Sequence, residues 1–201
     1  MTARIRRLTV VATTLAVAAT AACGTDSSSH LVSSSSTPPP TIRNVPLTAP
    51  GTVLKIGQPA GLDVHRDGKV FRIELTVTSI QKANRADFAK VTGDAMQKVA
   101  DVYYARGFLT PADSRNTASM EYGITPSFSA TTSSGNETPL FQVLGAFTAC
   151  PATLTPAPGG FTSCNMEATT EPGETIASLE LIGIDNSTSI PGRPGITWTN
   201  S

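Results

Sequence analysis

The chain has 201 residues, with 15 basic and 15 acidic side chains and therefore no formal net charge. It contains no run of like charge, so neither nucleic acid nor an anionic membrane surface is expected as an electrostatic partner. The length suits one domain with a single core once the N-terminal segments described next are set aside.

The segment 1–22 has the pattern of a secretory signal peptide. Arg4, Arg6 and Arg7 precede the uncharged stretch Leu8 to Ala22, which is small or apolar apart from its threonines. This stretch is too short for a membrane-spanning helix, which needs about 20 apolar residues. We therefore expect export and loss of the segment 1–22. Losing three arginines leaves 12 basic and 15 acidic side chains, a formal charge of −3.

Cys23 follows the leader in a context that resembles the bacterial lipobox. Thr20-Ala21-Ala22-Cys23 places two small residues before a cysteine, although Thr20 stands where the motif usually has an aliphatic residue. The resemblance implies that Cys23 is acylated and becomes the new N-terminus, which would hold the protein to the outer face of the cell membrane. The alternative is ordinary cleavage after Ala19-Thr20-Ala21, which would release a freely secreted chain.

The number of cysteines favours lipidation. Of the three in the chain, Cys150 and Cys164 are close enough in sequence to form a disulfide in an oxidising compartment. Such a bridge would close a loop rich in Pro and Gly and contribute about 3 kcal/mol. Because neither residue belongs to a C-x-x-C pair, we expect a structural bridge rather than a redox site. Cys23 is then left over, and acylation would remove its reactive thiol.

Residues 23–50 have the composition of a disordered linker. More than half of the positions from Gly24 to Pro50 are Ser, Thr or Pro, and such a segment cannot bury enough apolar surface to offset its conformational entropy. His30 lies inside this segment, so we interpret it as a solvated residue. The folded domain is expected to span residues 51–201.

Most of the domain has the composition of short β-strands. In the clearest segment, Phe71, Ile73, Leu75 and Val77 alternate with polar residues, and Asp67-Gly68 before them suits a tight hairpin turn. Further strands are expected at 53–56, 62–65, 102–109, 124–130, 140–147, 161–170, 176–184 and 196–199, with turns at 111–116, 133–136 and 171–174.

Residues 84–99 change period and predict a helix. Phe88, Val91, Ala95 and Val99 recur at spacings of three and four, and Asn84 can cap the start. Gly93 in the middle could divide the segment into two short pieces.

Many short strands with one short helical insertion predict an all-β, antiparallel β-sandwich. The domain resembles the immunoglobulin-like domain of unknown function found in exported and lipid-anchored proteins of Gram-positive bacteria, actinobacteria in particular. The resemblance rests on "KVFRIELTVTSIQKA", the pair Asp87-Phe88, "DVYYARGF" and "LGAFTAC" followed by a second cysteine. It implies a fold and no established chemistry.

No motif makes a strong case for catalysis, a metal or another cofactor. Ser79-Ile80-Gln81-Lys82 matches S-x-x-K, but the Ser-Asp-Asn and Lys-Thr-Gly elements that accompany it in penicillin-interacting enzymes are missing from the sequence. His65 has no second histidine or thiolate nearby in sequence, which is a poor signal for a metal site.

We therefore expect a lipid-anchored envelope protein that acts by binding and is not an enzyme. Its partner would be an envelope protein or a glycan. Tyr103, Tyr104 and Trp198 are either core residues or the basis of an exposed apolar patch for that partner. An exported hydrolase with an unrecognised site is the alternative. A pocket joining His65 to a carboxylate and a serine would favour it.

Overall fold

The computed structural model describes residues 42–66, 68–89, 91, 94–113, 115, 125–139, 141, 147–184 and 195–200. The expected leader, Cys23 and most of the expected linker lie outside these residues, as does most of the strand expected at 140–147. Each of the other expected strands coincides with an observed strand. In the described part of the chain, no helix is long and apolar enough to cross a membrane.

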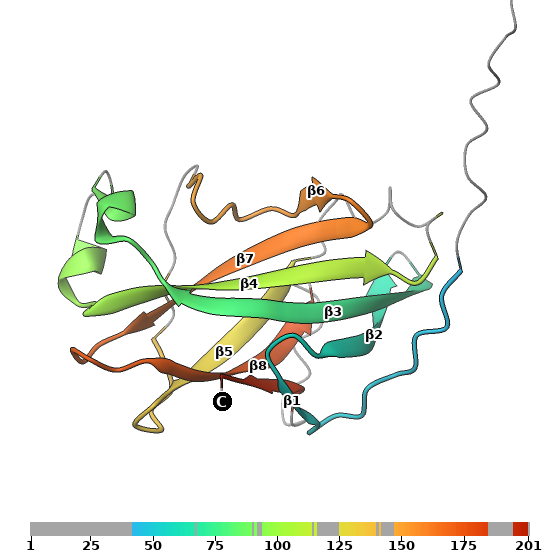
Figure 1. Ribbon diagram of the computed structural model, residues 1–201, viewed down its shortest axis with the longest axis horizontal. Coiled ribbons are helices and arrows are strands. Elements are labelled where there is room, and N and C mark those ends of the chain that lie inside the picture. The colour runs from blue at the N-terminus through green and yellow to red at the C-terminus, as the bar shows by residue number, and fades with distance from the viewer. Residues whose placement is uncertain are drawn as a thin grey trace, which may run out of the picture. The chain divides into compact units, whose positions relative to one another are not determined.

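The strands form two sheets that face each other (Figure 1). The five-stranded sheet is antiparallel throughout, in the order β2 (Pro59–Arg66), β3 (Lys69–Lys82), β4 (Asp101–Pro111), β7 (Gly160–Thr169) and β6 (Thr155–Ala157). The four-stranded sheet has the order β1 (Val53–Lys55), β9 (Thr197–Thr199), β8 (Ile176–Ile184) and β5 (Pro126–Thr132), with β1 and β9 parallel.

This strand order is that of an immunoglobulin-like sandwich. Strands β4, β6 and β7 take the places of B, D and E in one sheet, and β5, β8 and β9 take those of C, F and G in the other. Strand β3 lies beside β4 as strand A lies beside B. The fold class expected from the sequence, an all-β immunoglobulin-like antiparallel sandwich, is therefore confirmed.

The longest strand, β3, follows the alternation of apolar and polar residues from which it was predicted. Ile73, Leu75 and Val77 are buried between the sheets, and the residues between them are less buried. A bulge between Val77 and Ser79 shifts the register, so that Ile80 packs against the same core. At the other end, Gly68 has a φ of +70° in the two-residue turn between Arg66 and Lys69, as the expected hairpin requires.

The main core lies between the two sheets and centres on Trp198. This indole is fully buried, its Nε1 donates a hydrogen bond of 2.9 Å to the Gln58 carbonyl oxygen, and Phe128 meets it edge-on at 6.1 Å between ring centroids. In an immunoglobulin domain the buried tryptophan lies on strand C beside a disulfide that joins the sheets. Here it lies on the last strand, β9, and the disulfide is elsewhere.

A second cluster, which we call the outer core, covers the opposite face of the five-stranded sheet. Val102 and Tyr104 of β4 point into it, whereas Tyr103 and Ala105 between them point into the main core. Phe88 stacks on Phe147 at 5.0 Å between ring centroids. The other members are Cys150, Cys164, Phe141, Met166 and the partly buried residues Ala83, Val91, Met96, Val99 and Ala149. The middle of this sheet is therefore buried on both faces.

The single helix predicted at 84–99 is wrong, and the alternative of two short helical pieces agrees with the structure. The described residues contain two short 3₁₀ helices instead, η1 (Arg85–Phe88) and η2 (Asp94–Gln97). The physical reason is that the flanking strands are neighbours, since Ala83 N donates to Val102 O at 2.8 Å. A straight α-helix of this length would separate its ends by about 24 Å. The predicted cap is present, because Asn84 Oδ1 accepts a hydrogen bond of 3.0 Å from Ala86 N.

Residues 42–50 correct the expected boundary of the linker. They lie against the sandwich, with Val45 only 5% exposed and Thr48 N donating to Gly61 O at 2.9 Å. Gly61 allows this approach, because a Cβ there would lie 1.9 Å from Pro46 O. Arg72 also donates to the Val45 carbonyl oxygen at 2.6 Å. A composition rich in Ser, Thr and Pro did not reveal that these few residues have a surface to pack on.

Replacing Val45 by alanine tests whether this segment contributes to the folded domain. The change removes two methyl groups from a buried site, so the free energy of unfolding should fall by about 1.5 kcal/mol. Leu47→Ala is the matched control, because Leu47 is 56% exposed and its loss should change stability by less than about 0.5 kcal/mol. Equal urea midpoints for the two variants would show that the segment does not stabilise the domain.

Candidate functional site

The disulfide expected between Cys150 and Cys164 is present and contributes to the wall of a surface groove. The two Cα atoms are 5.2 Å apart. Cys164 lies on β7, and Cys150 begins the segment that leads to β6, so the bridge fastens that segment to the outer face of the five-stranded sheet. Cys23 lies outside the described residues.

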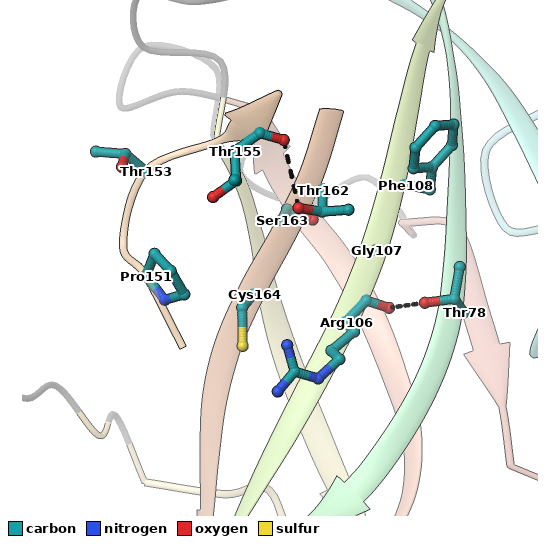
Figure 2. Close-up of a pocket in the computed structure, with 10 residues that line it drawn as sticks. All are labelled: Thr78, Arg106, Gly107, Phe108, Pro151, Thr153, Thr155, Thr162, Ser163 and Cys164. Atoms are coloured by element: carbon teal, nitrogen blue, oxygen red, sulfur yellow. Dashed lines mark hydrogen bonds between the residues drawn. The ribbon is translucent and has the colours of Figure 1, made fainter. Parts of the chain in front are cut away.

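The groove, which we call the threonine groove, lies between this segment and the sheet face (Figure 2). Its volume is about 240 Å³, and β3, β4 and β7 form its floor. The side chains that give it its character are Thr78, Arg106, Phe108, Thr153, Thr155 and Thr162, with Pro151 on the wall. Its polar surface is therefore supplied mainly by hydroxyl groups and one guanidinium.

Arg106 is the one charged side chain among the described lining residues. Its Nη2 donates a hydrogen bond of 3.0 Å to Ala149 O, and its guanidinium carbon lies 5.5 Å from the centre of the Tyr104 ring. Figure 2 shows the guanidinium extending toward the wall that carries Pro151. None of the ion pairs in the described part of the chain involves Arg106. The protein thus orients this charge, and no acidic side chain in the described part of the chain pairs with it.

The aromatic residues proposed for partner binding are not on the surface. Tyr103 and Tyr104 are 7% and 6% exposed, and Trp198 is fully buried. Each ring can be buried because its polar atom has a partner: Tyr103 donates to Glu174 O and Tyr104 to Asp87 Oδ2, both at 2.9 Å. Burial also raises the pKa of both tyrosines. The alternative in which these rings form an exposed patch is therefore wrong, and their role as core residues is correct.

The residues considered for catalysis are not brought together. Ser79 and Lys82 are three positions apart in β3 and so point to opposite faces of the strand. Lys82 is paired with Asp101 at 2.7 Å, and this hydrogen bond raises the pKa of the lysine, whereas a catalytic base needs a lowered pKa. His65 is exposed on β2, and no group of three or more potential metal ligands occurs among the described residues.

A row of polar side chains on the inner face of β7 was not predicted. Ser163, Asn165, Glu167 and Thr169 share this face. Three of their polar atoms are buried and have no hydrogen-bond partner among the described residues: Ser163 Oγ, Asn165 Nδ2 and Thr169 Oγ1. The sequence does alternate here, but its apolar members, such as Cys164 and Met166, point to the outer core. Only a sheet buried on both faces explains why the polar set points inward.

Glu167 is the one ionisable member of this row. It is 8% exposed, and burial raises the pKa of its carboxyl group to about 7. Thr138 Oγ1 donates to Glu167 Oε2 at 3.3 Å, which favours the charged form but does not compensate for the loss of water. This contact joins β7 to the segment that follows β5.

Glu167→Gln should alter how stability depends on pH. Because the folded pKa is raised from 4.5, the folded state keeps a proton that the unfolded state has released, so stability falls as pH rises from about 4.5 to about 7. The shift corresponds to about 3 kcal/mol. The variant should lose this decline and be more stable than the parent at pH 8, as measured by urea unfolding across pH. Glu171→Gln is the control, because it removes an exposed carboxylate. If the free energy of unfolding of Glu167→Gln fell with pH as steeply as that of the parent, the raised pKa of Glu167 would be contradicted.

Replacing Cys150 and Cys164 together by serine should weaken the fold. Freeing a loop with a sequence separation of 14 should lower the free energy of unfolding by about 3 kcal/mol. The measurement is chemical unfolding without reductant. Cys23→Ala is the matched control and should leave the unfolding midpoint unchanged. A double-serine variant as stable as this control would show that the bridge is not a stabilising constraint.

Comparisons with known proteins assign neither a family nor an activity. No family model matches the chain, and no curated protein matches it. One solved structure that it matches is that of MPT63, a secreted protein from Mycobacterium tuberculosis, with 18% sequence identity over 76% of this chain and 99% of that chain, and a TM-score of 0.41.

Proposed function

We propose that this chain is an exported binding protein of the cell envelope, held to the membrane by lipid on Cys23. The segment 1–22 has the pattern of a leader, and small residues precede the cysteine. The pairing of Cys150 with Cys164 supports this assignment, because it leaves Cys23 without a cysteine partner in the chain. A buried disulfide also suits the oxidising conditions outside the cytoplasm.

The observation that carries the binding role is the threonine groove. It combines hydroxyl groups, a guanidinium that forms no ion pair within the described part of the chain, and the apolar side chains of Phe108 and Pro151. These are the elements of a recognition surface. The described residues that line the groove include no carboxylate or histidine that could act as a base, and binding is the role that their geometry supports best.

The lipid anchor is tested by the intact mass of the protein purified from the membranes of its own host. The mature chain should begin at Cys23 and carry the mass of two or three acyl chains. Cys23→Ala should lose both this mass and membrane retention, and Thr25→Ala should keep both as a matched control. A chain recovered from the medium without added mass would contradict the anchor and leave a secreted domain.

The binding role is tested separately with the full mature chain carrying Cys23→Ala, which removes the lipid. Purified cell envelopes of the host should retain this chain in a sedimentation assay, and unlabelled chain should compete it away. Sedimentation no greater than that of an unrelated secreted protein of similar size and charge would contradict a binding role.

A further inference from the structure

The charge in the threonine groove indicates what kind of ligand it takes. Arg106 contributes one Nη donor to Ala149 O and stacks on Tyr104, so its orientation is fixed while its other N–H groups have no partner in the described part of the chain. No acidic side chain is among the described residues that line the groove. A guanidinium fixed in this way favours an anionic group, and its fork matches the geometry of a carboxylate or a phosphate.

The hydroxyl groups indicate that the rest of the ligand is rich in hydroxyls. Thr78 Oγ1 donates to Arg106 O at 3.1 Å and Thr162 Oγ1 donates to Thr155 O at 3.3 Å, which leaves the lone pairs of both threonines available. The hydroxyls of Thr153 and Thr155 form no hydrogen bond in the described part of the chain. Such groups can both donate and accept, as sugar hydroxyls also do. Phe108 adds an apolar surface for the carbon face of a ring.

The position of the groove argues against an extended peptide as the occupant. Peptides commonly bind sheets by adding a strand at an open edge. The floor of the groove is a sheet face, and β4, its central strand, already pairs with β3 on one side and β7 on the other. The floor therefore offers side chains and no free main-chain edge.

The size of the groove limits the ligand to a single unit. A volume of about 240 Å³ is below the range of about 300 to 1,000 Å³ that holds drug-sized molecules. It suits one ring of a longer chain that continues into solvent. The disulfide and the contact of Arg106 with Ala149 hold the wall against the floor before any ligand arrives.

We propose that the threonine groove binds one anionic sugar residue of a polysaccharide, with Arg106 pairing with its carboxylate or phosphate. This inference rests on the binding role proposed above and gives it a ligand class. Threonine hydroxyls would contact the sugar hydroxyls, and Phe108 would contact the ring.

The test measures binding to the full mature chain carrying Cys23→Ala by titration calorimetry and by NMR shifts of the groove threonines. The probes are a hyaluronan oligosaccharide for the carboxylate, a hexose 6-phosphate for the phosphate, a neutral cello-oligosaccharide, inorganic phosphate and an oligoglutamate peptide. One anionic sugar should bind at least tenfold more tightly than the neutral sugar, inorganic phosphate and the peptide. Preferred binding of the hyaluronan oligosaccharide would identify a carboxylate as the anionic group, and preferred binding of the hexose 6-phosphate would identify a phosphate.

Variants then assign the binding to the groove. Arg106→Gln should weaken binding of the anionic sugar at least tenfold, whereas Arg85→Gln, which removes an exposed charge outside the groove, should leave it unchanged. Thr155→Val should weaken binding without changing the charge. Equal affinity in Arg106→Gln and the parent would overturn the proposal.

Several outcomes reject the ligand class while leaving the proposed function standing. If the oligoglutamate bound more tightly than the anionic sugars, the partner would be a peptide. If inorganic phosphate bound as tightly as the anionic sugars, the groove would be a simple anion site. A chain that sediments with envelopes but binds neither anionic sugar would retain the binding role and lose the sugar. Failure of envelope sedimentation, by contrast, would reject the proposed function itself.

Discussion

The structure depends on burial of the middle of the five-stranded sheet on both of its faces. The main core lies on one face, and on the other Phe88, Phe147 and the disulfide pack over β4 and β7. An antiparallel sheet often leaves one face to solvent, and its strands then alternate simply between apolar and polar residues. Here the outer face has its own small core, and this core supports both the wall of the threonine groove and the two 3₁₀ turns.

The outer core brings together pieces of the sequence that lie far apart along the chain. Asp87 accepts a hydrogen bond from Tyr104, Phe88 packs on the same ring, and Phe147 and Cys150 close the cluster. The Asp-Phe pair, the Tyr-Tyr strand and the segment before the first cysteine are therefore parts of one contact.

Much of the fold could be predicted from the sequence because period and turn residues are local properties. The alternation in β3 and the glycine of the β2–β3 turn needed no knowledge of distant residues. The polar row on β7 could not be assigned to a face, because that choice depends on the outer core, which distant residues build. The docking of Val45 depends on Gly61 in the same way. The path of residues 84–99 was missed because the closeness of Ala83 and Val102 is a tertiary constraint.

The site could be predicted only in part. The cysteine pairing followed from counting and compartment, but the groove draws its threonines from positions as far apart as Thr78 and Thr162, which no motif connects. The aromatic residues, by contrast, suggested an exposed binding patch that the structure does not contain in its described part. A tyrosine or tryptophan is expected at a binding surface because its polar atom needs a partner, yet the fold supplies that partner internally for each of the three.

Under the proposed function, the small groove and the lipid anchor would complement each other physically. A groove of this size would offer one sugar residue few contacts, whereas association costs on the order of 10 kcal/mol in lost translational and rotational freedom. A single contact of this kind is therefore weak for a chain free in solution. Chains held on one membrane beside a repeating polymer would engage several units at once, and each further contact would then be intramolecular. Lipidation would thus determine how tightly the protein binds the polymer as well as where the protein lies.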